Sequence, residues 1–353
     1  MTKTPVGLIQ TVLGPVKPEN LGLTMAHEHL LLDIRCYVQQ AEAASDRTYR
    51  NTLIKMDNLG NLPERFQYSL ENMTLLDEAA AIEEAYEFKL AGGQSFVDTT
   101  SGGSIGRDPL GLARISRATG INIVMGSGYY VWQSHPEDMN DKSVESIAEE
   151  IINEIENGVK DTGIKPGVIG EIGCSWPIHP NELKSLEAAA IAQKNTGAAM
   201  TLHPVGPREA KDKILNVIQK AGADCNKVIF GHCDHYSDQD DVLNLLKAGC
   251  YIELDVFGWE DTSLELIMPS AKFGNDQERI ENIGQIIEMG FGDKILIAQD
   301  VCQKWQYQRY GGKGFSHILD NIIHRFKTFG FSDSDINNLL VNNPKKAFAF
   351  DIG

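Results

Sequence analysis

Short apolar runs rich in β-branched residues alternate along the chain with longer stretches whose apolar residues recur every three or four positions. One example is "PGVIGEIG" (166–173), which is followed by "NELKSLEAAAIAQKNTG" (181–197). The first pattern predicts a buried β-strand and the second an amphipathic helix, and a closing glycine is typical of a helix C-cap. The predicted strands are 22–30, 95–100, 121–128, 166–173, 198–204, 227–234, 250–258 and 294–300.

A helical stretch follows each of these strands, and such alternation is typical of a parallel sheet. Eight strand–helix units favour an α/β fold, the closed (β/α)8 TIM barrel, for which about 250 residues is typical and to which longer chains add insertions. An open doubly wound sheet is the competing fold, but no GxGxxG follows the first strand. A last helix is predicted over "SDSDINNLLVNNPKKAFAF", with its N-cap at Ser332 or Ser334.

The sequence predicts one domain over residues 1–353, with two segments longer than a barrel needs. Residues 33–73 separate the first strand from its helix, and residues 258–276 follow the seventh strand. Both segments leave from the C-terminal ends of strands, where barrels carry their active sites. Loops of this length often cover or bind a ligand, so we expect both at the mouth of the site, with subunit contact as the alternative.

The balance of charge excludes several classes of partner. The chain carries 49 acidic against 32 basic residues, a formal net charge of −17, and no dense cluster of lysine and arginine. A phosphate backbone or an anionic lipid surface would be repelled. We therefore expect a small-molecule substrate, and neither a nucleic acid nor a membrane as partner.

The N-terminal stretch and the cysteines indicate a cytoplasmic protein. "MTKTPVGLIQTVLG" lacks the long apolar region of a signal peptide. No apolar run approaches the roughly 18 residues of a membrane span. The six cysteines are scattered and form no CxxC pair, so we expect free thiols in a reducing compartment.

Six candidate metal ligands lie on the predicted strands. His27 and His29 stand two apart in the first strand, and residues two apart point to the same face. The other candidates lie at or near the C-terminal ends of later strands, where the active sites of barrels gather. They are Glu171, His203, His232 and Asp300.

A single buried histidine is usually a hydrogen-bonded core residue, but packing gives no reason to bury so many polar groups at one rim. Four imidazoles and two carboxylates suit zinc, with manganese, cobalt or iron as alternatives. Glu28 is expected to point away from the barrel interior, into an ion pair or hydrogen bond. Of Glu253 and Asp255 in the seventh strand, one is expected to reach the mouth, and Asp255 is nearer the strand end.

Several segments resemble the phosphotriesterase family of the amidohydrolase superfamily. They are "TVLGPVKPENLGLTMAHEHL", "GVIGEIGCSWP", the HP of "TLHPVG", "GHCDH", and the "QD" that closes the eighth strand. The resemblance runs over nearly the whole chain and implies two divalent metal ions, with zinc as the expected metal, and a homodimer. It implies that the ligands of the more buried metal are His27, His29 and Asp300, those of the more exposed metal His203 and His232, and the bridge Glu171.

Two positions depart from phosphotriesterases proper. There a carboxylated lysine bridges the metals, whereas Glu171 supplies its own two oxygens, so no modified lysine is expected. Those enzymes also have a histidine after the aspartate of the seventh strand, whereas Asp255 is followed by Val256. The interrupted proton relay argues against efficient hydrolysis of organophosphates.

"YGGKGFSHIL" and "GEIGCSWP" resemble most closely the animal branch of this family. That resemblance implies hydrolysis of a linear amide bond, with N-acetyltaurine as the expected substrate and other N-acetyl amino acids as further candidates. A metal-bridging hydroxide would attack the carbonyl, with Glu171 and Asp300 as catalytic residues, and Asp300 would pass a proton to the leaving group. Lactone or ester hydrolysis is the alternative within the family. The alternative outside enzymes is a metal-containing barrel that only binds a ligand.

A taurine sulfonate requires a cation or a helix N-terminus beside it. The segment after the eighth strand offers Lys304, Arg309 and Lys313, and Arg107 follows the second strand. Tyr129, Trp259 and Trp305 are predicted to line the acyl pocket. The alternative for these side chains is exposure to solvent.

Overall fold

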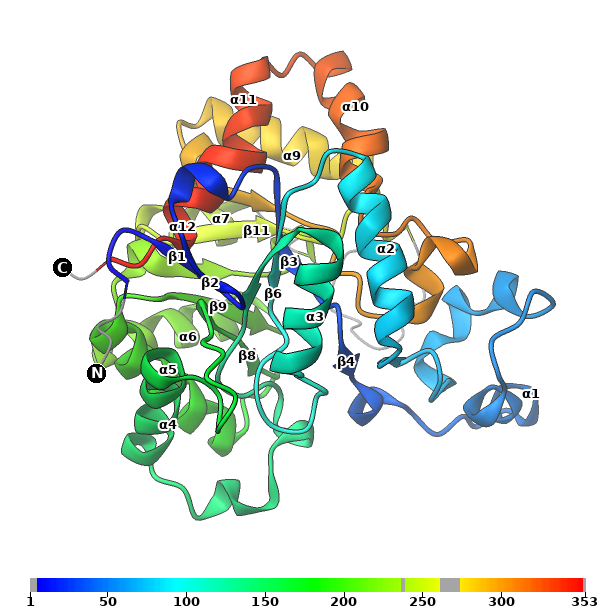
Figure 1. The fold of residues 1–353 in the computed structure, drawn as a ribbon, viewed down its shortest axis with the longest axis horizontal. Coiled ribbons are helices and arrows are strands. Elements are labelled where there is room, and N and C mark those ends of the chain that lie inside the picture. Colours follow the sequence, from blue (N-terminus) through cyan, green and yellow to red (C-terminus); the bar gives the residue numbers. More distant parts are fainter. Residues whose placement is uncertain (1–4, 236–238, 261–273, 352–353) are drawn as a thin grey trace.

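Parallel strands close into a barrel in the computed structural model, which describes residues 5–235, 239–260 and 274–351 (Figure 1). The barrel strands are β3 (Thr24–Glu28), β6 (Ser95–Asp98), β7 (Asn122–Met125), β8 (Val168–Cys174), β9 (Ala199–Pro204), β10 (Val228–Phe230), β11 (Tyr251–Leu254) and β12 (Ile295–Ile297). Five of them pair in the order β12–β11–β10–β9–β8 and three in the order β3–β6–β7. The (β/α)8 fold expected from the sequence is confirmed.

Two seams join the five-stranded and three-stranded parts. Between β7 and β8, the Gly167 amide donates to the Met125 carbonyl at 2.9 Å, and Ser127 forms a bridge with Gly170. Between β3 and β12, the Glu28 side chain accepts hydrogen bonds from the backbone that follows β12. The barrel is therefore closed by hydrogen bonds on both sides.

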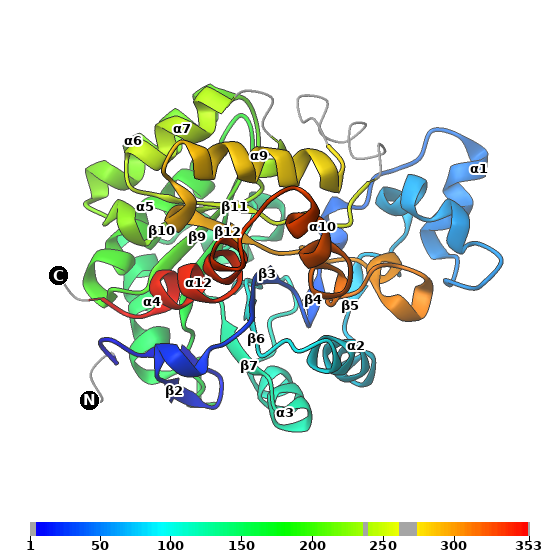
Figure 2. The ribbon, with the colours of Figure 1, turned by 90° about the horizontal axis from the view of Figure 1, so that it is seen from above.

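Helices surround the strands (Figure 2). They are α2 (Glu78–Leu90), α3 (Pro109–Thr119), α4 (Val144–Asn157), α5 (Pro180–Thr196), α6 (Arg208–Ala221), α7 (Gln239–Lys247), α9 (Asp276–Glu288) and α10 (Ile323–Thr328). Their ends follow local sequence signals. Asp77 caps α2 by accepting from the amides of Ala79 and Ala80, and Gly197 ends α5 with a φ of 69°, a left-handed conformation that glycine adopts at little cost.

Apolar side chains fill the closed end of the barrel. The cluster includes Ala26, Val97, Val124, Val168, Ala199, Ile229 and Leu296 from the strands. Ile9 of β1 (Ile9–Thr11) and Phe348 of α12 (Asn343–Phe348) complete it. Each large apolar side chain buried in this way contributes roughly 1.5–3 kcal/mol. Because this end is filled, the opposite rim, at the C-terminal ends of the strands, is the one that can hold a site.

The closing helix expected near the C-terminus is divided. It consists of α11 (Asp333–Asn337), a π-helical turn at Asn338–Asn342, and α12. Its N-cap is Ser332, whose hydroxyl accepts from the Asp335 amide at 3.1 Å. The first of the two expected caps is therefore correct.

The first long segment has its two ends paired. β4 (Leu32–Asp33) and β5 (Thr74–Leu75) run antiparallel, and the residues between them form 3-10 turns and the short α1 (Ala44–Arg47), which lies to the side of the barrel in Figure 1. Most of the second long segment, 258–276, lies outside the described residues. Among the helices in the described ranges, none is both long and apolar enough to cross a membrane.

Candidate metal centre

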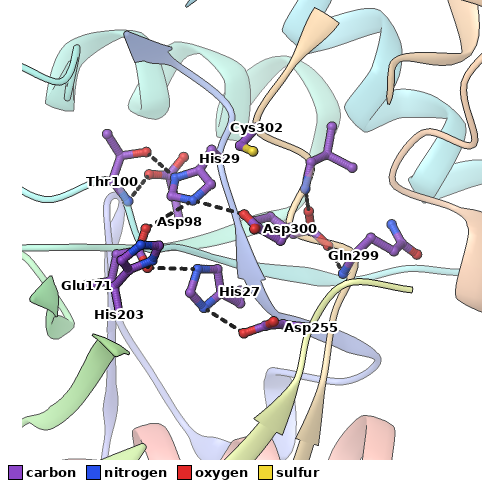
Figure 3. A network of polar contacts seen from close by, with 12 residues as sticks. His27, His29, Asp98, Thr100, Glu171, His203, Asp255, Gln299, Asp300 and Cys302 are labelled. Carbon is purple, nitrogen blue, oxygen red and sulfur yellow. Dashed lines mark hydrogen bonds and ion pairs between the residues drawn. The ribbon is translucent and has the colours of Figure 1, made fainter. Parts of the chain in front are cut away.

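The first group of polar side chains at the barrel mouth joins the end of β3 to the residues after β12 (Figure 3). His29 Nε2 lies 3.3 Å from Asp300 Oδ1, while its Nδ1 lies 2.9 Å from the Thr100 hydroxyl. His27, His29 and Asp300 each offer an atom, and all three atoms lie within 4.8 Å of one another. All three residues are buried. The sequence placed them at one rim, and the structure brings them together.

The Glu171 carboxylate lies beside His27, His29 and His203 (Figure 3). Its Oε2 is 3.4 Å from His27 Nε2 and 3.1 Å from His203 Nδ1. The same Oε2 is 3.4 Å from His232 Nε2, and Oε1 is 3.6 Å from His29 Nε2. One carboxylate thus faces four imidazoles, a position from which its two oxygens can reach two metal ions.

His203 and His232 form the second group with Glu171. His203 Nδ1 and His232 Nε2 are only 2.6 Å apart. His232 has a φ of 53°, a conformation that a non-glycine residue keeps only when its surroundings impose it. The Asp255 carboxylate supplies that support, because Oδ2 accepts from the His232 amide at 2.8 Å and Oδ1 lies 2.9 Å from its Nδ1.

Two carboxylates at the C-terminal end of β11, Glu253 within the strand and Asp255 directly after it, hold the outer nitrogens of two imidazoles. Glu253 Oε2 lies 2.9 Å from His27 Nδ1, as Asp255 does from His232. A histidine whose outer nitrogen donates to a carboxylate presents a lone pair on the other nitrogen, the form that binds metals. We expected one of these two acids to reach the mouth; both contact a histidine of the site, but neither lines the cavity above it. Asp255 is itself fixed by its amide, which donates to Asp234 Oδ2 at 2.8 Å.

The charges of the site balance one another. Burial alone would lower the pKa of His27, but Glu171 and Glu253 raise it well above its ordinary value. Burial would raise the pKa of Glu171, but His203 and His27 hold it well below the usual range. Asp255 likewise raises the pKa of His232 against the effect of burial. The site therefore stabilises ionised carboxylates next to positive charge. That charge is carried by protons on the imidazoles, and a metal ion can replace those protons.

Within the described part of the chain, a buried nitrogen without a hydrogen-bond partner shows that this set of residues suits a metal ion. His27 Nε2 is buried and has no hydrogen-bond partner among the described residues. A buried polar atom without a partner costs about 1–3 kcal/mol, and a metal ion at this position would satisfy it. Imidazole nitrogens and carboxylate oxygens are also the donors that zinc and similar metals prefer. The residues present fit two divalent ions.

A cavity of about 410 Å³ opens above this centre. His203, His232 and Asp300 form part of its floor, and Tyr37 and Tyr130 part of its wall. The Tyr130 hydroxyl lies 3.2 Å from His203 Nε2 and 3.3 Å from the Tyr37 hydroxyl. Neither tyrosine was among the residues expected from the sequence, although Tyr130 directly follows Tyr129, which was expected to line the acyl pocket.

The expected substrate contacts lie elsewhere. Tyr129 donates to Glu150 at 2.7 Å and lines a separate cavity behind α4. Lys304 Nζ lies 3.2 Å from Glu71, and Arg309 lies 3.5 Å from Glu83. Lys313 packs near Gly258, and Arg107 pairs with Glu154 at 2.7 Å. None of these five residues lines the cavity above the metal centre, whereas Trp259, which was also expected to line the acyl pocket, does.

The fold and the site together define a TIM barrel with a histidine–carboxylate centre at the C-terminal ends of its strands. The chain belongs to the phosphotriesterase family, which it matches over residues 7–348, so the resemblance found in the sequence is confirmed. It is 38% identical over 350 residues to an N-acetyltaurine hydrolase of Salmo salar and 36% identical over 346 residues to that of Homo sapiens. Each comparison covers 98% of both chains.

Two solved structures are similar in fold. A resiniferatoxin-binding protein from Rhodobacter sphaeroides has 33% sequence identity and a TM-score of 0.92, covering 97% of this chain and 95% of that chain. A lactonase from Listeria monocytogenes has 25% identity and a TM-score of 0.78, covering 98% and 99%.

Proposed function

We propose that the protein is a metal-dependent amide hydrolase that cleaves N-acetyltaurine to acetate and taurine. The observation that carries the proposal is the position of Glu171, one carboxylate that faces four imidazoles beneath the cavity. The curated relatives with that activity in their names share 36–38% of their residues with this chain over nearly its full length. Other N-acetyl amino acids belong to the same substrate class.

We propose two divalent ions, with zinc as the native metal because of the nitrogen and oxygen donors. The ligands of one would be His27, His29 and Asp300, those of the other His203 and His232, and Glu171 would reach both. When bound, such ions lower the pKa of water and polarise a carbonyl. No lysine modification is needed, because Glu171 supplies both oxygens.

Side chains of the protein transfer the proton and donate hydrogen bonds in the proposed reaction. Asp300, on the cavity floor, accepts the proton of the attacking water and passes it to the leaving amine. Burial raises the pKa of both Tyr37 and Tyr130 well above the ordinary value, so both phenols remain hydrogen-bond donors at neutral pH. Val256 lines the cavity where a relay histidine would have to stand for efficient organophosphate hydrolysis.

A panel of substrates tests the proposal. N-acetyltaurine should be cleaved with a higher kcat/KM than N-acetyl amino acids, a set of lactones, and paraoxon. Asp300→Asn should lose this activity while the protein stays folded. A lactone as the best substrate would replace the proposal with the lactonase alternative. Ligand binding without any hydrolysis would favour the non-catalytic barrel.

We further propose that residues 1–353 form one domain, that the protein is cytoplasmic, and that it forms a homodimer. The six free cysteines support a reducing compartment. A single thermal transition, cell fractionation and light scattering after size-exclusion chromatography test the three statements in turn. Elemental analysis of the purified protein tests zinc.

A further inference from the structure

A buried polar network ties the long segment between β4 and β5 to the loop after β12. Asn72, which is fully buried, stands at its centre. The Asn72 carbonyl accepts from the Lys304 amide at 3.0 Å, and its side-chain Oδ1 accepts from the Trp305 amide at 3.0 Å. Asn72 Nδ2 donates to Gln303 Oε1 at 2.9 Å.

This network fixes which way the Gln303 amide faces. A backbone amide can only donate, so the oxygen of Asn72 must face Trp305 and its nitrogen must face Gln303. The Trp305 indole nitrogen can also only donate, and it reaches the same Gln303 Oε1 at 2.8 Å. Two independent donors therefore hold the Gln303 oxygen inside the network, and the nitrogen must point the other way.

The other side of Gln303 is the cavity above the metal centre. Within the described ranges, Gln303 Nε2 donates to no oxygen, and its side chain meets the thiol of Cys302, which also lines the cavity. A thiol is a weak acceptor. One N–H group of Gln303 meets only this weak acceptor, and the other is available to an oxygen of a bound substrate.

Gln303 shares a wall of the cavity with Asp300. Gln306 joins the two, since its Nε2 donates to the Asp300 carbonyl at 3.2 Å and its Oε1 accepts from the Gln303 amide at 2.8 Å. Because Asp300 delivers the proton to the leaving amine, the amine half of the substrate lies along this wall. The described residues that line the cavity include no lysine or arginine, so, apart from the proposed metal ligands, the donors that they offer to an anionic group are neutral.

We infer that the Gln303 amide binds a sulfonate oxygen on the amine half of the substrate, and that Asn72 and Trp305 act as positioning residues that keep its nitrogen turned to the cavity. The inference rests on the proposed function. It assigns recognition of the anion to a neutral amide held in one orientation.

The test compares N-acetyltaurine with N-acetylethanolamine, in which a hydroxyl replaces the sulfonate. Gln303→Glu keeps the shape and both network bonds but presents an oxygen anion to the cavity. We expect KM for N-acetyltaurine to rise by roughly tenfold or more, and KM for N-acetylethanolamine by less than about threefold. Metal content and kcat should change little. Gln303→Met, which removes the donor without adding charge, should shift KM in the same direction by a smaller factor.

Asn72→Asp tests the positioning role. Its second oxygen would face and repel Gln303 Oε1, so only the Trp305 indole would still hold the Gln303 oxygen inside and the amide would lose its single orientation. We expect a rise in KM that is again confined to the sulfonate substrate. Gln40→Glu, an exposed change of the same charge on the same segment, is the control and should leave both KM values within about twofold.

Equal changes in KM for both substrates in Gln303→Glu and Gln303→Met would overturn the inference and leave the proposed function standing. An unchanged KM for N-acetyltaurine in both variants would do the same. A wild-type enzyme that does not cleave N-acetyltaurine would overturn the proposed function and this inference with it.

Discussion

The carboxylate of Glu28 holds the backbone on both sides of Asp300. Its Oε1 accepts from the Gln299 amide and its Oε2 from the Val301 amide, each at 2.8 Å. Asp300 itself has a φ of 47°, a left-handed conformation that costs a non-glycine residue about 1–3 kcal/mol. The two hydrogen bonds stabilise that conformation and aim the Asp300 carboxylate at His29.

Replacing Glu28 by Gln should weaken metal binding. The substitution keeps the shape but turns an NH2 group toward one of the two backbone amides, so a buried donor loses its partner. We expect a loss of about 1–3 kcal/mol in stability and a roughly 10- to 100-fold fall in metal affinity, measured by competition with a chelator. Glu78→Gln, which alters an exposed pair with Arg114, is the control. Wild-type affinity in Glu28→Gln would mean that other contacts hold Asp300.

Removal of metal should destabilise the fold. A ligand present at about a thousand times its Kd stabilises the native state by about 4 kcal/mol. In a chain of this size we expect dialysis against a chelator to lower Tm by roughly 5–15 °C and added zinc to restore it. Scanning calorimetry measures both. In Glu171→Gln, which removes the central charge, the shift should be much smaller, and an equal shift would place the ions elsewhere.

Two half-buried cysteines should differ in reactivity. A hydrogen bond from Cys250 lowers the pKa of Cys225 to about 6, against the effect of burial. Burial raises the pKa of Cys36 to about 11. Because the thiolate is the nucleophile, Cys225 should be alkylated rapidly above pH 6 and slowly below it. Cys36 should stay protonated and slow at pH 7.5. Peptide mass analysis after iodoacetamide pulses measures both, and equal rates would contradict the expectation.

Two glycines at helix C-caps should tolerate alanine differently. Gly197 and Gly120 have nearly the same φ, 69° and 70°. An added Cβ would strike the Asp351 backbone at Gly197 but would meet nothing within 4 Å at Gly120. Gly120→Ala should cost about 1–2 kcal/mol for the conformation alone, and Gly197→Ala roughly 2–4 kcal/mol. Urea unfolding measures the difference, and equal losses would mean that the C-terminal segment moves away easily.

The fold and the six convergent side chains were predictable because they follow local periodicity. A strand has a period of two and its C-terminal end lies at the barrel rim, so His27, His29 and Asp300 could be placed without knowledge of any distant contact. The alternation is not perfect, since the pairing of β3 with β6 shifts between Met25 and Glu28. This irregularity did not affect the predicted positions of the ligands, because the prediction required only that each residue lie near the C-terminal end of its strand.

The substrate contacts could not be predicted in the same way. A basic residue in a loop carries no signal of its direction, and the partners of Lys304 and Arg309 lie more than 200 residues away in the chain, at Glu71 and Glu83. For the same reason the sequence could not show which of Tyr129 and Tyr130 lines the cavity, because the two tyrosines follow the end of β7, where strand parity no longer applies. Loop geometry, and not residue type, decides which polar groups face the cavity.

Leu32 pairs with Leu75 and Asp33 with Thr74. This pairing separates the segment that forms part of the cavity wall from the strand ends that carry the proposed metal ligands. The groups proposed to perform the reaction lie at strand ends, whereas residues 34–73 form a strip anchored at its two ends. A segment anchored in this way can change in length or sequence without moving the proposed metal ligands at the strand ends. A change within residues 34–73 can therefore reshape the cavity, which Tyr37, Phe66 and Met73 line, while the proposed metal ligands stay in place.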